Sequence, residues 1–197
     1  MRPIQFLFVM SVFVSATGSS QSVTSNSALS HCTQRESLYF NCLVEGGNKV
    51  ASVCGTHSGS DNHRIKQIQY RFGAIGQVEF RYPPSGGRAL DLVHFESQGT
   101  RDGSTQDYFL WFRNGRWIYE VYYREEFGNC SETGCSDEKA GQAAFVSVWR
   151  GAEAWRTGHI ESGRRFRCTN PESNAAFKEL EGKGLFHPES KNRIFSD

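Results

Sequence analysis

Three carboxylates in one aromatic-rich stretch, Glu120, Glu125 and Glu126, are the residue type that glycoside hydrolysis requires. That reaction uses two carboxyl groups, one on each side of the bond that is cleaved. Neighbouring residues of a strand point to opposite faces, so a working pair needs a distant partner such as Asp91 or Glu96, which the sequence does not locate. Surface and strand-end charges are therefore the better interpretation of these residues.

Other catalytic and metal-binding patterns are missing from the sequence. It has no G-x-S-x-G turn, no glycine-rich phosphate loop, no dinucleotide motif and no C-x2-C pair for zinc. The histidines are scattered, and His57 and His63, which share an expected loop, have neither a helical H-x-x-x-H pattern nor a frame of aspartates and glutamates to complete a metal site. We expect no catalytic residue, no metal ligand, no cofactor and no enzymatic activity.

A segment that leads into a short cysteine loop carries the residues that we expect to bind a partner. Tyrosine and arginine are frequent interface anchors, and a disulfide between Cys130 and Cys135 would lower the ordering cost of binding. The predicted binding residues are Tyr122, Tyr123, Arg124 and Phe127. The alternative is that the disulfide only keeps the loop from fraying.

The cysteines indicate three disulfides and an oxidising compartment. There are six: Cys32, Cys42, Cys54, Cys130, Cys135 and Cys168. Many pairings are possible, and Cys130 with Cys135 is the easiest local one because Gly134 helps so short a loop to close. We expect the other four to tie the amino-terminal strands to the carboxy-terminal segment.

The first residues have the pattern of a secretory signal peptide, with a basic residue, an apolar run and a small-residue cleavage site. It covers residues 1–16, and the polar tract at residues 17–31 is expected to be a flexible leader. A single disulfide-bonded β domain over residues 32–182 and a tail over residues 183–197 complete the expected organisation. We expect the protein to be periplasmic or secreted.

The charge balance argues against nucleic acid and anionic lipid as partners. The sequence has 22 basic and 21 acidic residues, and loss of Arg2 with the signal peptide would make them equal. No net field then attracts a polyanion. No later window reaches the roughly 18 apolar residues of a membrane-spanning helix, so we expect no integral membrane segment.

A hairpin over residues 107–124 is the strongest structural signal. Asn114-Gly115 lies between two runs of aromatic and β-branched residues, and this pair favours a tight turn. Closing the turn on these two residues pairs Phe112 with Trp117. Apolar side chains then occupy both faces, which places the hairpin in the middle of a sheet and requires cover on both sides.

Further strands surround this hairpin, and loops are expected at residues 55–63 and 97–106. The expected strands are residues 38–44, 49–54, 65–72, 77–82, 90–96, 143–149, 155–160 and 164–168. In the hairpin that begins at residue 65, alternation pairs Phe72 with Val78 and sets Arg71 opposite Glu79.

The pattern as a whole predicts a mainly β fold, an antiparallel β-sandwich or open barrel of about nine or ten strands with one short C-terminal helix. Asn170-Pro171 has the form of a helix start, so we expect this helix over residues 171–181. Ala176, Phe177 and Leu180 would face the sheet.

Several spaced motifs resemble a group of small exported bacterial proteins of uncharacterised function. The motifs are Cys32-x3-Glu36-x3-Phe40-x-Cys42, Lys49-x2-Ser52-x-Cys54, Tyr70-Arg71-Phe72-Gly73 and Glu79-x2-Tyr82-Pro83. They are cysteines and hairpin residues, so the resemblance implies no catalytic assignment. In size and architecture the chain is also similar to periplasmic lysozyme inhibitors and to immunity proteins against cell-wall toxins.

These observations favour an exported, non-enzymatic binding module, an inhibitor or immunity-type protein, that recognises a protein or glycan of the cell envelope. The alternatives are a hydrolase of envelope polysaccharide or peptidoglycan and a structural component of the envelope.

Overall fold

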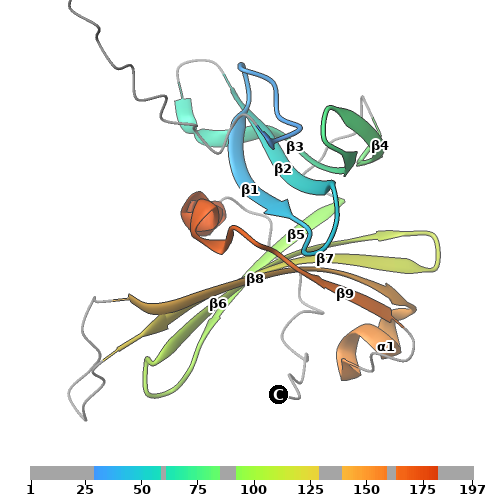
Figure 1. Cartoon of the computed structure of the whole chain (residues 1–197). Helices are drawn as coiled ribbons and strands as arrows, with labels where there is room; N and C mark the ends of the chain where they lie inside the picture. Colours follow the sequence, from blue (N-terminus) through green and yellow to red (C-terminus); the bar gives the residue numbers. More distant parts are fainter. Residues whose placement is uncertain (1–28, 59–60, 85–91, 129–138, 159–162, 182–197) are drawn as a thin grey trace, which may run out of the picture.

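Two antiparallel sheets pack face to face (Figure 1). The computed structural model describes residues 29–58, 61–84, 92–128, 139–158 and 163–181. The first sheet has the strand order β1 (Ser37–Leu43), β2 (Lys49–Ser58), β3 (Asp61–Ala74) and β4 (Gln77–Tyr82). The second has the order β5 (Val93–Gly99), β6 (Thr105–Asn114), β7 (Trp117–Phe127), β8 (Lys139–Arg150) and β9 (Gly163–Arg167). The predicted mainly β, antiparallel class is confirmed.

The core between the sheets is built largely from aromatic rings. Phe112 of β6 stacks on Tyr82 of β4 with 4.4 Å between ring centroids, and Tyr119 of β7 stacks on Phe80 of β4 at 4.9 Å. Tyr70 of β3 lies 5.3 Å from Phe112. Residues two apart on a strand share a face, so regular alternation gives each sheet one row of rings. Burying a ring of this size stabilises the fold by about 1.5–3 kcal/mol.

The central hairpin forms with a register two residues from the predicted one. Phe112 faces Tyr119, and Asn114 faces Trp117, so the predicted pairing of Phe112 with Trp117 is wrong. The two-residue loop begins with Gly115 at a φ of 58°, a conformation that glycine adopts without strain. A shift of two residues leaves every side chain on its predicted face. The aromatic row therefore still reaches the core.

The opposite face of this hairpin is covered as well, as predicted. Trp111, Ile118 and Trp149 form a second buried cluster there with Trp155. β6 and β7 therefore lie in the interior of the five-stranded sheet and are buried on both sides.

Trp155 comes from a short helix, α1 (Ala152–Thr157), so the strand expected over residues 155–160 is wrong in its described part. Two glycines with positive φ bound the helix, Gly151 at 91° and Gly158 at 68°. They turn the chain out of β8 and then end the helix. The Trp155 indole therefore packs against the outer face of the sheet. None of the described helices has the length and apolar content of a membrane span.

The second hairpin, β3 and β4, contains a bulge. Phe72 faces Phe80, two residues from its predicted partner Val78, and the pairing shifts by one residue between Phe72 and Gly73. The predicted cross-strand pair of Arg71 with Glu79 is therefore wrong. The predicted core faces of both strands are retained, since the register away from the bulge differs from the prediction by two residues.

The strands extend further than expected into two predicted loops. β2 continues to Ser58 and β3 begins at Asp61, so most of the region expected as a loop over residues 55–63 is strand. β5 likewise continues to Gly99, and β6 begins at Thr105. Polar composition suggested loops, but cross-strand pairing continues through these residues.

The short C-terminal helix expected over residues 171–181 is a 3-10 helix, η4 (Pro171–Leu180). Phe177 and Leu180 are fully buried against the core, as predicted, and Ala176 is half-buried. Asn170 does not cap the helix through its side chain. Its Oδ1 instead accepts a hydrogen bond from the backbone N–H of Leu43.

Asn174 makes a similar bond to β1. Its buried Oδ1 accepts from the backbone N–H of Asn41 at 2.7 Å. β1 is an edge strand of its sheet, so these N–H groups have no neighbouring strand to bond. The two asparagine side chains supply the missing acceptors and hold η4 along β1.

Two disulfides connect the described part of the chain. Cys42 bonds Cys168 and ties β1 to the residue after β9, as expected for a link between the two ends of the domain. Cys32 bonds Cys54, 22 residues away, so the expectation that this pair also reaches the carboxy-terminal segment is wrong. Next to the Cys42–Cys168 disulfide, Val44 and Cys168 form an isolated β-bridge.

Some predictions concern residues outside the described ranges. They are the signal peptide at residues 1–16, most of the leader at residues 17–31, the Cys130–Cys135 disulfide and the tail at residues 183–197.

The bulge gives a test of the second hairpin. A Cβ on Gly73 would lie 2.1 Å from the carbonyl oxygen of Gln77 and 2.6 Å from the amide of Glu79, both backbone atoms. Gly73→Ala should therefore lower the free energy of unfolding by about 2 kcal/mol or more, measured by urea unfolding. Gly47→Ala is the control, because its nearest neighbours are 3.8 Å away. Equal stabilities of the two variants would contradict the bulge.

Candidate ligand-binding site

The four predicted binding residues lie on β7, but not on one face. Tyr123 is fully buried in the core between the sheets, so its side chain is not available to a partner in this structure. Tyr122 and Arg124 lie on the opposite face and are partly exposed. Phe127 ends the strand and is half-buried. Strict alternation along β7 separates the residues that the sequence reasoning grouped.

The polar groups of Tyr122 and Arg124 are both hydrogen-bonded to Asp107 of β6. The Arg124 guanidinium donates to both carboxylate oxygens, from Nε at 2.7 Å and from Nη2 at 3.0 Å. The Tyr122 hydroxyl donates to the same carboxylate at 2.8 Å. Burial, together with the Asp107 charge, raises the pKa of Tyr122, and the hydrogen bond to Asp107 raises the pKa of Arg124. A partner would have to displace these bonds.

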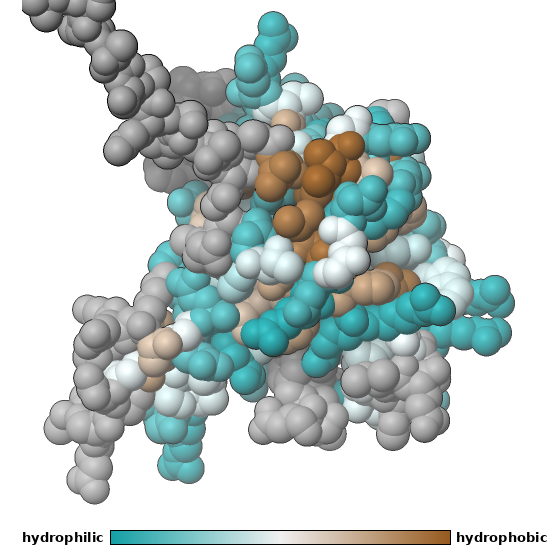
Figure 2. All heavy atoms as spheres, in the orientation of Figure 1, coloured by the Kyte–Doolittle hydropathy of each residue, from teal (hydrophilic) through white to brown (hydrophobic). Residues whose placement is uncertain are grey.

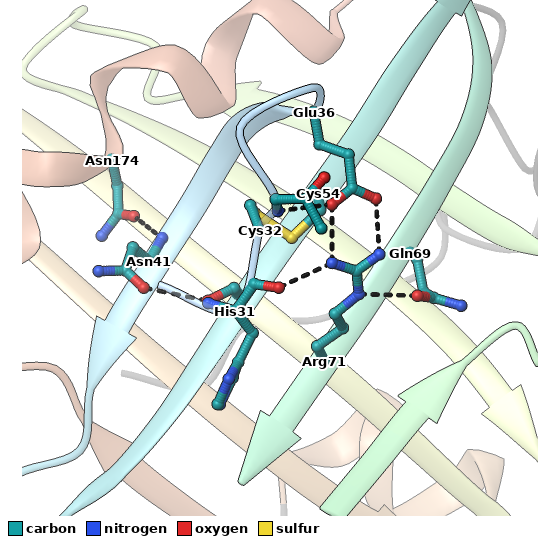
Figure 3. The surroundings of a disulfide bond; sticks show 10 residues. His31, Cys32, Glu36, Asn41, Cys54, Gln69, Arg71 and Asn174 are labelled. Atoms are coloured by element: carbon teal, nitrogen blue, oxygen red, sulfur yellow. Dashed lines mark hydrogen bonds and ion pairs between the residues drawn. A yellow bond between two sulfur atoms is a disulfide. The ribbon is translucent and has the colours of Figure 1, made fainter. Parts of the chain in front are cut away.

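A second polar cluster lies beside the Cys32–Cys54 disulfide (Figure 3). The Arg71 guanidinium makes two bonds to the Glu36 carboxylate, at 2.6 and 2.8 Å. It also donates to the Gln69 side chain and to the backbone oxygen of His31, each at 2.7 Å. These bonds involve all three nitrogens of the guanidinium. The cluster ties the segment before β1 to β3. It leaves few N–H groups of the Arg71 guanidinium for a ligand.

The carboxylates considered for hydrolysis are separated by the sheet. Glu120 is buried on the outer face, where it accepts a hydrogen bond from the Trp155 indole at 2.8 Å. Glu125 is buried on the inner face and accepts from the Tyr123 hydroxyl at 3.2 Å. Two buried carboxylates on opposite faces of one sheet cannot flank a single bond.

The remaining candidates for catalysis do not form a known constellation. Glu126 is exposed, Glu96 is half-buried on β5, and Asp91 is outside the described residues. Ser37 Oγ lies 3.0 Å from His57 Nε2, the spacing of a nucleophile and its base. The other ring nitrogen, Nδ1, is buried without a hydrogen-bond partner among the described residues, so no carboxylate orients the ring.

An open hollow lies over β7, β8 and β9 on the face that carries the core residues. Its volume is about 490 Å³, within the range of roughly 300–1,000 Å³ that is typical of small-molecule sites. The hollow is lined by Trp117, Tyr119, Val148, Arg150, Gly163, Arg164 and Phe166. We call it the basic hollow.

Strand pairing brings these residues together from three strands. Trp117 of β7 faces Arg150 of β8, and Val148 faces Arg164 of β9. Figure 2 shows hydrophobic side chains in the upper half of the molecule and hydrophilic side chains below them. The hollow thus combines an aromatic lining with cationic groups.

The two lining arginines, Arg150 and Arg164, are exposed and make no ion pair within the described part of the chain. β9 has the sequence GRRFR, three arginines in five residues with no acid. Burial raises the pKa of Tyr119, which keeps its hydroxyl neutral beside the arginines. The site can therefore attract and bind an anionic group.

Sequence reasoning did not single out Arg150, Arg164 or Trp117. The net charge of the whole chain sums these arginines with acidic residues elsewhere. It therefore does not reveal the local excess of positive charge at the hollow. Arg164 and Phe166 are two residues apart in β9 and therefore share a face. This spacing is a sequence signal for a strand face that is both basic and aromatic. The contribution of β7 and β8 depends on a register that composition does not reveal.

The buried position of Tyr123 gives a stability prediction. Tyr123→Ala should lower the free energy of unfolding by about 3–5 kcal/mol, as expected for removal of a buried aromatic ring. Arg124→Ala should cost less, about 1–3 kcal/mol, because it removes the ion pair of Asp107 but leaves the Tyr122 hydrogen bond, and the lost side chain is 29% exposed. Urea unfolding measures both, and an equal cost would contradict the burial of Tyr123.

The Glu36 cluster predicts a pH dependence. Burial acts to raise the pKa of Glu36, but hydrogen bonds from Arg71 and Thr33 outweigh it and hold the pKa below its ordinary value of 4.5. A carboxyl with a lowered pKa stabilises the fold above the unfolded pKa and loses this contribution as pH falls through the folded pKa. Wild type should therefore be more stable than Glu36→Gln at neutral pH. The difference should shrink below pH 4.5 in urea unfolding; a constant difference would contradict this.

Comparison with known proteins gives no match: no family model matches the chain, and no curated protein or solved structure is significantly similar to it. The resemblance to small exported bacterial proteins stays a prediction.

Proposed function

We propose that this protein is an exported, non-enzymatic binding module that takes an anionic protein or glycan partner in the basic hollow. Two disulfides support the exported part of the proposal, because such bonds persist in oxidising compartments and are rare in the cytoplasm. Periplasmic or secreted localisation belongs to the same proposal.

The observation that carries the proposal is the pair Arg150 and Arg164. Both are exposed and without an ion pair in the described part of the chain, and both line the hollow beside its aromatic side chains. Arginine forms a planar fork of donors that matches a carboxylate, sulfate or phosphate group. By contrast, the guanidinium groups of Arg71 and Arg124 are already bonded to carboxylates.

The lining supports binding in preference to catalysis. The described residues that line the hollow include no carboxylate, histidine, serine or cysteine. The hydroxyl of Tyr119 has a raised pKa, which makes it a poor base at neutral pH. A rigid sheet face with these groups suits recognition, as in an inhibitor or immunity-type protein that covers an acidic part of its target.

Charge removal at the hollow tests the proposal. The wild-type protein should bind polygalacturonate or poly-L-glutamate, and not neutral dextran, in calorimetric titrations at low ionic strength. Arg150→Ala with Arg164→Ala should weaken this binding by more than about tenfold, which corresponds to about 1.4 kcal/mol.

The control is Arg81→Ala with Arg101→Ala, which removes the same charge from exposed residues of β4 and of the loop before β6. It should change the affinity by less than about twofold. The proposal fails if neither anionic polymer binds, or if the control loses as much affinity as the hollow variant.

A further inference from the structure

We infer that the ligand of the basic hollow is an acidic saccharide, whose ring packs on the aromatic lining while its acidic group bonds to the arginines. This inference rests on the proposed function and narrows its partner to one chemical class.

The spacing of the arginines fits one acidic sugar or two consecutive ones. Arg164 faces Val148, and Arg150 lies two residues further along β8 on the same face. Such a diagonal pair on adjacent strands has a Cα separation of about 7–8 Å. Long, flexible arginine side chains can cover this distance, so both guanidinium groups can reach one carboxylate or bond to neighbouring ones.

The aromatic lining offers a flat apolar surface next to these cations. Trp117, Tyr119 and Phe166 are half-buried, so part of each ring remains accessible. The Arg116 guanidinium lies 5.6 Å from the centroid of the Trp117 ring and takes one face of the indole. A pyranose ring has C–H groups on its faces and polar groups around its edge. That distribution matches an aromatic surface with guanidinium groups beside it.

The strand backbones favour a saccharide over an acidic peptide. The hollow lies on the face of the sheet, and the backbone groups of β7 and β8 are engaged in ladders with the strands on both sides. A peptide laid over this face would lose water from its own amides without gaining backbone partners. A peptide could instead add a strand at the β9 edge, but it would then not need the Trp117 ring.

A single-stranded nucleic acid also combines rings with anions. Such ligands are held by a series of bases stacked on successive aromatic side chains and by a basic groove that follows the backbone. Here two arginines and one cluster of rings line a single hollow. The site has the size of a short sugar segment. Preferential binding of an oligonucleotide is one possible outcome of the test.

The experiment compares four short anionic probes with the full protein at fixed ionic strength: tetragalacturonate, a dextran sulfate oligomer, hexaglutamate and hexathymidylate. One of the two saccharides should bind at least about fivefold more tightly than the peptide and the oligonucleotide. The first two probes also distinguish a carboxylated from a sulfated sugar.

Trp117→Ala should weaken saccharide binding by about tenfold, and Trp117→Phe should restore most of it, because a ring is retained. The control is Phe145→Ala, which removes a half-buried ring that also has an arginine, Arg165, over it, from the opposite face of the same sheet. This control should leave the affinity within about twofold of wild type. Far-ultraviolet circular dichroism and melting temperature verify that each variant is folded.

The outcomes separate the two proposals. Tighter binding of the peptide or oligonucleotide through Arg150 and Arg164 would overturn the saccharide inference and leave the anionic-partner proposal standing. Saccharide binding that is insensitive to Trp117→Ala would also overturn the inference. Absence of arginine-dependent binding to all four probes would overturn both.

Discussion

The junction between β1 and the end of β9 is the constraint on which the rest of the structure depends. The Cys42–Cys168 disulfide, the Val44–Cys168 bridge and a hydrogen bond from Glu45 N to Arg167 O at 2.9 Å all meet there. The disulfide spans 126 residues, and a loop of that length removes unfolded-state entropy worth about 4–5 kcal/mol in the chain-entropy account. This junction joins one sheet to the other at a fixed corner.

The basic hollow follows from that corner. With the residue after β9 fixed, β9 pairs with β8 so that Arg164 and Phe166 share the face of Tyr119. The neighbouring arginines of β9 turn to the other face, where Arg165 lies over the Trp149 ring at 5.7 Å. One short strand therefore supplies cations to both faces of the sheet, and its inner arginine, Arg164, lies with Arg150 of β8 beside the aromatic rings of β7.

Sequence reasoning succeeded where alternation decides and failed where a single residue changes the register. The faces of both predicted hairpins are right, because exchange of a face costs burial of polar residues. Their registers are wrong, because the Gly73 bulge and a loop that begins at Gly115 are local choices of the backbone. The predicted site grouped Tyr122 with Tyr123, although neighbours on a strand diverge. The hollow itself joins three strands, and no local pattern spans them.

The bonds from Asn170 and Asn174 to β1 have a consequence for how the chain matures. The acceptors lie 127 and 133 residues after the N–H groups that they satisfy. β1 emerges early in synthesis, so its outer edge stays without these partners until nearly the whole domain has been made. An open strand edge can pair with another chain, and long-range contacts form slowly. Newly made chains are thus most prone to join through β1 in the interval before η4 arrives, and dilution or a chaperone would protect them then.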